Sequence, residues 1–288
     1  MNYIYTSPDP KAITSNFKDA FLTPEFIKAS KSTVALGNGV LLDIATAAHV
    51  LIAGETGGGK SVLLHDVICS LLMKNNPTTM DLLLIDPKMV EFDYFYKNNP
   101  CLFCPVATDP VEALERLEQA ANEMMRRYSI MKQEGKRFWT GKKLYIVIDE
   151  IADLISAGGK RLEKVIEKIC RLGRGAGCHV IAATQHPVRS VISRQITANM
   201  DTRICLRVID SSASRLVLGA TGGEKLKGKG DAIIRHNGEF RRFQAAYIDD
   251  ESLERFAHSW AAEEVTPQFT VTTDAQALLA ERKERNKT

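Results

Sequence analysis

The 288-residue sequence lacks any apolar run long enough to cross a bilayer. Its first residues, Met1 to Tyr5, do not place a basic region before an apolar one, so we expect no signal peptide. Cys101 and Cys104 form a C-x-x-C pattern without the second pair that a structural zinc site needs. We interpret both as packing residues, with a zinc or redox role as the alternative. Six scattered cysteines favour a reducing compartment. A cytoplasmic protein is therefore expected, recruited to a membrane only through a partner.

Extreme composition is also absent. The net charge is +3, too small to indicate nucleic-acid binding by itself, and we find no internal repeat or low-complexity tract. Hydrophobic residues make up 44% of the chain, which excludes global disorder and allows a sizeable core. The length suits one large α/β domain or two small ones.

One glycine-rich stretch fits the phosphate-loop pattern G-x-x-x-x-G-K-[ST] without a mismatch: Gly54-Glu55-Thr56-Gly57-Gly58-Gly59-Lys60-Ser61. An apolar run, Val50–Ala53, precedes it and an amphipathic helix follows, as the mechanism requires. Glycines allow backbone N–H groups to turn toward an anion, and the helix start adds its dipole. Lys60 would then reach the β- and γ-phosphates of ATP, and the Ser61 hydroxyl would hold Mg²⁺. The alternative is a glycine-rich turn that matches by chance.

A second buried run, Leu144 to Ile148, ends in the acidic pair Asp149-Glu150. A phosphate-loop ATPase needs such a pair: Asp149 would join the Mg²⁺ shell and Glu150 would orient or deprotonate the attacking water. The alternative is an acidic N-cap for the following helix.

Further apolar runs predict strands separated by helices: Leu82 to Ile85, His179 to Ala183, Ile204 to Val208 and Ala232 to Ile234. This alternation favours an α/β fold with a mostly parallel sheet covered by helices on both faces. Two of these strands are followed by polar residues: Asp86 after the first, and Thr184-Gln185 after the second. These residues either face a ligand crevice or form plain turns. Val34 to Ile44 predicts a hairpin, and Lys160 to Leu172 a helix. Another long helix starts at Asp109-Pro110.

The motifs together resemble the FtsK/SpoIIIE family of hexameric DNA translocases over roughly Val34 to Tyr247. Besides the phosphate loop and the acidic pair, the resemblance rests on several segments in the same order: Asp86-Pro87-Lys88-Met89-Val90-Glu91, Glu123, Arg126-Arg127-Tyr128, Leu172-Gly173-Arg174, Ala183-Thr184-Gln185, Ala198-Asn199, Thr202-Arg203 and Gly228-Lys229-Gly230-Asp231. The segment that begins at Asp86 is far more selective for this family than a phosphate loop.

The resemblance implies a RecA-like P-loop motor core at residues 33–250, between an N-terminal arm (1–32) and a helical tail (251–288). It implies a ring, expected to be a hexamer, that hydrolyses ATP and moves double-stranded DNA. Arg174 would be an arginine finger inserted into the neighbouring subunit's site, extending from a mobile turn between glycines, and Gln185 would sense the nucleotide. The chain is similar to reduced motors of mobile elements, so a relaxase, replication or membrane-channel partner is expected to set the direction.

Contacts to DNA need cations aimed at phosphates more than base readout. Arg189, Arg194 and Arg215 are the candidates, together with Lys225, Lys227 and Lys229. Only Arg215 coincides with a basic position of the family; His186 and Thr197 stand at two others. Two alternative functions stay open: an ATPase that energises protein secretion, and a nucleotide-gated assembly module without catalysis.

Overall fold

The fold is known from a computed structural model that describes residues 20–95, 99–187 and 193–261. A seven-stranded sheet runs through it in the order β4-β5-β6-β3-β7-β8-β9, with the first five strands parallel and the last two antiparallel. The strands are β3 (Val50–Ala53), β4 (Met80–Ile85), β5 (Lys143–Ile148), β6 (Cys178–Thr184), β7 (Thr202–Cys205), β8 (Asp231–His236) and β9 (Glu239–Gln244). The strand that leads into the phosphate loop, β3, therefore lies at the centre.

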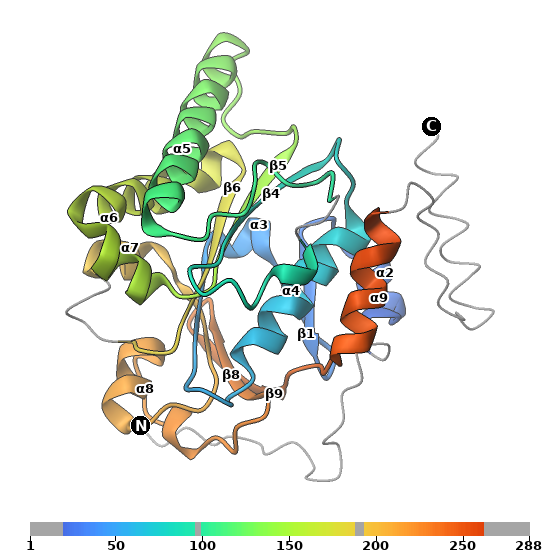
Figure 1. The fold of residues 1–288 in the computed structure, drawn as a ribbon, viewed down its shortest axis with the longest axis vertical. Coiled ribbons are helices and arrows are strands. Elements are labelled where there is room, and N and C mark those ends of the chain that lie inside the picture. Colours follow the sequence, from blue (N-terminus) through green and yellow to red (C-terminus); the bar gives the residue numbers. More distant parts are fainter. Residues whose placement is uncertain (1–19, 96–98, 188–192, 262–288) are drawn as a thin grey trace.

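Helices cover both faces of the sheet (Figure 1). One face is covered by α4 (Lys60–Lys74), α9 (Asp250–Ala261), α2 (Pro24–Lys28) and a separate hairpin, β1 (Thr33–Gly37) and β2 (Val40–Asp43). The other is covered by α5 (Pro110–Gln133), α6 (Ile151–Ala176) and α7 (Arg194–Asn199). The remaining elements are α3 (Ile44–Ala47), η1 (Asp93–Phe95), α8 (Ser211–Leu218) and η2 (Gly223–Lys225). Helix α8 packs against β7 and η2.

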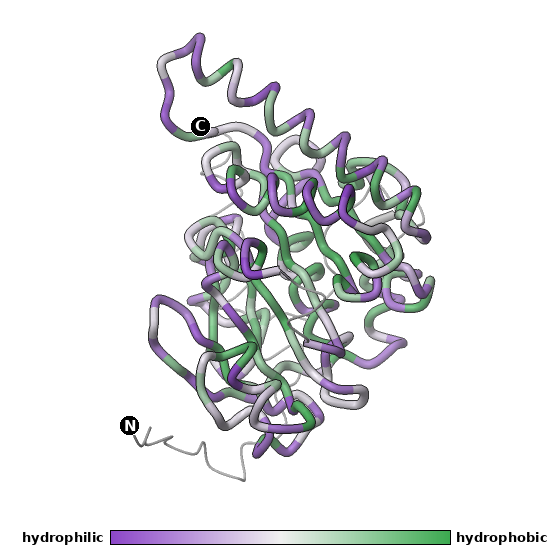
Figure 2. Tube along the Cα trace, turned by 90° about the vertical axis from the view of Figure 1, so that its left-hand side faces the viewer, coloured by the Kyte–Doolittle hydropathy of each residue, from purple (hydrophilic) through white to green (hydrophobic). Residues whose placement is uncertain are grey.

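Hydrophobic residues concentrate on the strands, as the buried runs predicted (Figure 2). Every residue of β3 and β6 is buried, because helices pack on both faces of these strands. The predicted α/β fold with a mostly parallel sheet is thereby confirmed. None of the helices in the described ranges combines the length and the apolar character of a membrane span.

The sequence predictions miss one strand and differ from the structure mainly in the extent of one helix and one strand. Strand β9 was not predicted, because its outward residues are charged and only Phe243 is buried. The helix predicted from Lys160 is the second part of α6, which starts at Ile151 and bends at Gly159 (φ 65°). Its C-terminal end at Ala176 lies past the predicted end. Strand β7 starts two residues before its prediction and ends three before it.

The described residues on either flank of the predicted core include buried side chains. Phe21 and Phe26 are buried in the same cluster as α4, and so are Leu253 and Phe256 of α9. Residues 1–19 and the predicted frayed helix at 279–287 lie outside the described residues.

Candidate nucleotide-binding site

The phosphate loop leaves the carboxyl end of β3 and is fixed by its neighbours. Its first amide, at Gly54, donates to the Thr184 carbonyl (3.1 Å), and the Gly230 amide donates to the Gly58 carbonyl (2.8 Å). Gly59 has φ 103°, and a Cβ there would lie 2.7 Å from the Gly230 nitrogen. Only glycine fits this approach, so the loop rests on the segment before β8.

Helix α4 starts directly behind this loop, at Lys60. Its N-cap, Gly59, offers no side-chain hydrogen bond, so the N–H groups of the first turn remain available to an anion. The Lys60 ammonium is buried against Asp149, whose main-chain carbonyl lies 3.0 Å away and whose carboxylate Oδ1 is in direct contact. The phosphate-loop lysine and the first acid of the β5 pair are therefore brought together.

The groups that could hold Mg²⁺ lie next to this ion pair. The second oxygen of Asp149, Oδ2, is buried and has no hydrogen-bond partner among the described residues. The Ser61 hydroxyl donates to the Glu91 carboxylate at 2.6 Å. Carboxylate and hydroxyl oxygens are what Mg²⁺ prefers, and the unpartnered Oδ2 of Asp149 is available as a ligand, so these residues fit the ion.

The loop that follows β4 holds Glu91 in place. Asp86 is fully buried, and its carboxylate accepts hydrogen bonds from the amides of Lys88 (3.2 Å), Glu91 (3.0 Å) and Phe92 (3.0 Å). His65 of α4 adds a contact of 2.6 Å between its Nε2 and the Glu91 carbonyl. Asp86 thus organises a turn that places the Glu91 carboxylate over Ser61. Sequence reasoning missed this role of Glu91, although it had singled out the segment.

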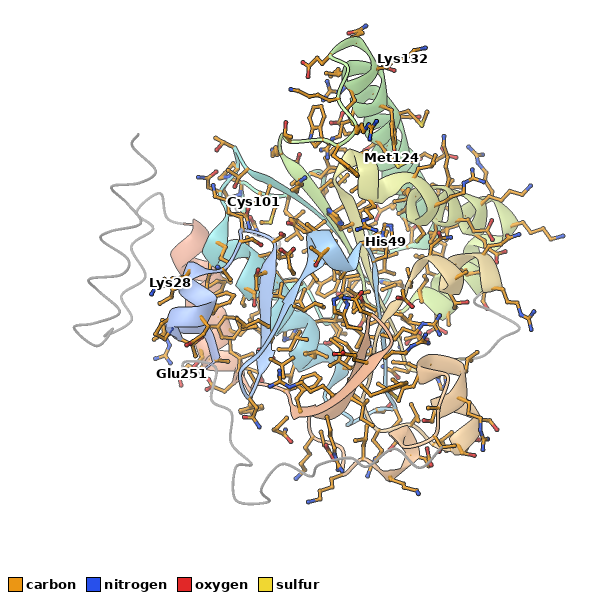
Figure 3. The ribbon with its side chains drawn as sticks, turned by 180° about the vertical axis from the view of Figure 1, so that it is seen from behind. Lys28, His49, Cys101, Met124, Lys132 and Glu251 are labelled. Carbon is orange, nitrogen blue, oxygen red and sulfur yellow. The ribbon has the colours of Figure 1, made fainter. Side chains whose placement is uncertain are left out.

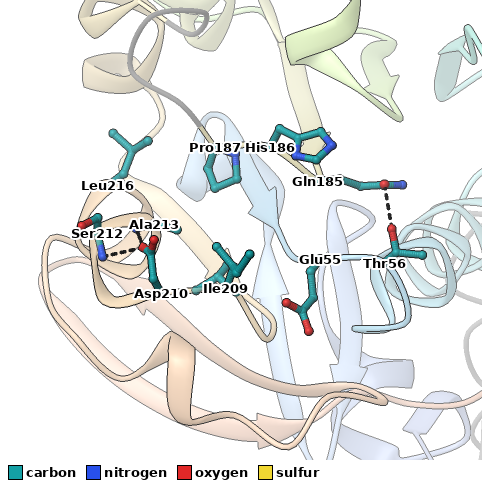
Figure 4. A pocket seen from close by; sticks show the side chains of 11 residues that line it. Glu55, Thr56, Gln185, His186, Pro187, Ile209, Asp210, Ser212, Ala213 and Leu216 are labelled. Carbon is teal, nitrogen blue, oxygen red and sulfur yellow. Dashed lines mark hydrogen bonds between the residues drawn. The ribbon is translucent and has the colours of Figure 1, made fainter.

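The second acid, Glu150, is fixed by the neighbouring strand. It is fully buried, and its carboxylate accepts hydrogen bonds from the Thr184 hydroxyl (2.6 Å) and the Gln185 amide (2.8 Å). The Gln185 side chain in turn accepts a hydrogen bond from the Thr56 hydroxyl at 3.1 Å (Figure 4). Although Glu150 occupies the N-cap of α6, its side chain does not cap that helix. The N-cap alternative is therefore wrong, and the end of β6 links Glu150 to the phosphate loop.

A cavity of about 610 Å³ opens beside Thr56 and Gln185. Its other wall is the segment between β7 and α8, including Ile209, whose side chain is 83% exposed (Figure 4). Arg207 of this segment pairs with Glu55. The cavity therefore lies between the phosphate loop and α8, the helix that carries Arg215.

Arg174 lies at the opposite end of the sheet. It belongs to the last turn of α6, one turn before β6 begins, and the adjoining Gly173 packs on His49 at the start of β3. A distance of roughly 17 Å separates the two ends, since β3 rises about 3.3 Å per residue from His49 to Gly54. The prediction of a mobile turn is wrong: the helix continues through both neighbouring glycines to Ala176. The Arg174 side chain is exposed there.

The candidate DNA contacts lie on separate elements. Arg194 is the first residue of α7, and Arg215 is exposed on α8, where it donates to Ser211 (3.2 Å). Lys225, Lys227 and Lys229 are exposed between α8 and β8. Arg189 lies outside the described residues.

Cys101 and Cys104 pack into the two different hydrophobic clusters on either face of the sheet. This placement agrees with the packing interpretation.

The family model described as FtsK/SpoIIIE family matches residues 25–143. The DNA translocase FtsK of Clostridium acetobutylicum is 38% identical over 268 residues, which cover 85% of this chain and 35% of that protein. The DNA translocase FtsK of Staphylococcus epidermidis is 37% identical over 239 residues, covering 76% of this chain and 30% of the relative. The chain thus spans about a third of the length of these relatives.

Solved structures agree on the fold. The pCW3 conjugation coupling protein TcpA, in its monomer form with ATPγS, is 26% identical with a TM-score of 0.73, and the match covers 87% of this chain and 75% of that one. EssC (ATPases 2 and 3) from Geobacillus thermodenitrificans has the same fold at 17% identity, with a TM-score of 0.72 over 88% of this chain and 52% of its own. The motifs, the fold and the similarity to the translocases lead to one conclusion: the chain belongs to the FtsK/SpoIIIE family.

Proposed function

We propose that this chain is the motor of an ATP-driven translocase of double-stranded DNA, working as a ring with ATP sites shared between subunits. The observation that carries the proposal is the arrangement of Lys60, Asp149 and Glu150 beneath a loop shaped for phosphate. Its relatives named DNA translocases support the substrate. The conjugation coupling protein with the same fold supports a role in DNA transfer.

Each residue has a separate task. The N–H groups of the loop and the Lys60 ammonium bind the phosphates. Ser61 and Asp149 would hold Mg²⁺, which would neutralise charge on the phosphoryl group. Glu150 accepts a proton from the attacking water, because Thr184 and the Gln185 amide fix its carboxylate in place. Gln185 touches both Glu150 and Thr56, so it can report the state of the nucleotide to the segment that follows β6.

The position of Arg174 supports a shared site. Its side chain is exposed at the amino-terminal end of the sheet, so it cannot reach the phosphates bound by its own chain. A second copy can place Arg174 against those phosphates, where a cation stabilises the transition state. A closed ring supplies one such contact to each site; we propose six subunits. Mobile-element DNA transfer in the cytoplasm, with a relaxase or membrane channel as partner, is the setting we propose.

The decisive test is the ATPase rate with and without linear duplex DNA, measured over a salt series. Stimulation that weakens as salt rises supports translocation, because phosphate contacts release counterions. Basal turnover that DNA leaves unchanged would refute the DNA assignment and favour the export of a protein substrate.

Glu150→Gln is the catalytic control. The amide can still accept from the Gln185 N–H and donate to the Thr184 hydroxyl, so we expect ATP binding to persist while turnover falls about 100-fold or more. Hydrolysis at the wild-type rate would show that Glu150 is not the base and reopen the possibility of an assembly module.

A further inference from the structure

The last turn of α6, which carries Arg174, is held in place by three large residues. They are Arg127 and Tyr128 of α5 and Trp139 of the segment before β5, and we call them the brace. Helix α5 extends beyond the sheet (Figure 1), with Met124 near its packed part and Lys132 close to its far end (Figure 3).

Arg127 makes the central contacts of the brace. It is only 1% exposed, although it carries a charge. Its Nη1 donates to the carbonyls of Ala176 (3.1 Å) and Gly177 (3.3 Å), where α6 ends. Its Nε donates to Glu123 (2.8 Å) and its guanidinium lies 5.3 Å from the Trp139 ring centre. A helix C-terminus has unpaired carbonyls and a negative dipole, so a buried cation satisfies both needs there.

The other two members hold the same turn at Leu172, two residues before Arg174, and at Gly175, the residue after it. The Tyr128 hydroxyl donates to the Leu172 carbonyl at 2.7 Å, and it leaves no room for a Cβ at Gly175, which would lie 2.6 Å from its oxygen. The Trp139 amide donates to the Gly175 carbonyl at 2.9 Å. The backbone from Leu172 to Gly177 is therefore fixed on both sides of Arg174, while the side chain of that residue points to solvent.

We propose that Arg127 and Tyr128 are positioning residues for Arg174. They set the place from which the arginine reaches the ATP site of the next subunit. The proposal rests on the shared site proposed above. It predicts that a substitution in the brace slows ATP hydrolysis at the neighbouring subunit's site and leaves the ATP site of the substituted chain intact.

The variants are Arg127→Met and Tyr128→Phe, with Arg126→Met as the matched control. Arg126 pairs with the same Glu123 carboxylate at 2.6 Å, is exposed, and makes no hydrogen bond or ion pair with α6 among the described residues. We expect Arg127→Met to lower kcat by roughly 10- to 100-fold with little change in KM, since small misplacements of catalytic groups cost that much. Tyr128→Phe should lower kcat several-fold, and Arg126→Met should leave it unchanged.

Mixing subunits separates positioning from folding. Lys60→Ala disables the ATP site of a chain but leaves its Arg174 in place. In a mixed ring, the intact ATP site of an Arg127→Met chain can therefore receive a correctly placed Arg174 from a neighbouring Lys60→Ala chain. We expect a mixture of Arg127→Met and Lys60→Ala chains to hydrolyse more ATP than the two separate rates combined. Arg127→Met and Tyr128→Phe should each unfold in one cooperative thermal transition and, measured alone, bind a fluorescent ATP analogue as tightly as wild type.

The reference mixture is Arg174→Ala with Lys60→Ala. If it recovers activity and the Arg127→Met mixture does not, the positioning role is overturned while the shared site stands. If the reference mixture also stays inactive, the shared site itself is wrong and the positioning role falls with it. Should Arg127→Met fail to fold, Tyr128→Phe decides the question, because it removes one hydroxyl and keeps the ring.

Discussion

Asp66 is a buried carboxyl of α4, the helix that follows the phosphate loop, and its protonation can be tested through the pH dependence of stability. It lies in the second turn of α4, is fully buried, and has no hydrogen-bond partner for either carboxylate oxygen within the described chain. Burial raises the pKa of this carboxyl well above its usual value. An unpartnered carboxyl takes up a proton rather than burying its charge, so the folded protein holds Asp66 neutral.

The pH dependence follows from the two states. In the unfolded chain the carboxyl ionises above a pKa of about 3.9, whereas the folded chain keeps its proton. The folded state therefore binds more protons, and stability is lost as pH rises above that value. The slope is at most about 1.4 kcal/mol per pH unit, so wild type should lose up to about 2.7 kcal/mol between pH 5 and pH 7 through this group.

Asp66→Asn removes the titration and keeps the shape of the side chain. Its free energy of unfolding, measured in urea by circular dichroism, should gain up to about 2.7 kcal/mol on wild type between pH 5 and pH 7. The amide's own unmet hydrogen bonds add an offset that does not change with pH. Asp201→Asn, at an exposed carboxylate 3.7 Å from Arg235, is the surface comparison in the same urea series. A constant gap for Asp66→Asn would refute the reasoning.

Three further predictions concern other contacts of the site and its support. Burial lowers the pKa of His179 to about 4, so the folded state resists protonation and stability is lost as pH falls below 6.5. From pH 6.5 to 4.5, the free energy of unfolding of wild type should therefore fall relative to that of His179→Phe by up to about 1.4 kcal/mol per pH unit. A difference between the two that does not change with pH contradicts this. Gly59→Ala, which meets the Gly230 backbone, should lower the free energy of unfolding by about 1–3 kcal/mol. Gly57→Ala shares the positive φ but meets nothing within 4 Å, so it should cost less; equal losses would argue against the contact. Thr184→Val frees one oxygen of Glu150, and kcat should fall about 10-fold at unchanged ATP affinity. A rate equal to wild type would show that the hydroxyl does not position the base.

Local patterns were enough to predict the centre of the fold. Strands β3, β5 and β6 are continuous apolar runs because both faces are buried, and the phosphate loop and acidic pair follow them directly. The parallel register then brings Lys60 to Asp149, which adjacent sequence alone could only suggest.

What sequence could not predict depends on contacts between distant segments. The role of Glu91 needs the carboxylate of Asp86 and the ring of His65, which lie on different elements. The rigidity of the Arg174 turn comes from Arg127 and Tyr128, about 45 residues earlier, so its flanking glycines misleadingly suggested mobility. Those glycines are there because the packing leaves no space for side chains.

The central place of β3 also sets an order for synthesis. This strand and its phosphate loop are complete by Ser61, but the two strands that flank β3 end at Thr184 and Cys205, and the Gly230 contact comes later still. At about 5–20 residues per second, the ribosome needs roughly 8 to 34 s more to reach Gly230. We therefore expect a nascent chain to bind nucleotide only after most of it has emerged, which protects the cell from half-made motors that could consume ATP.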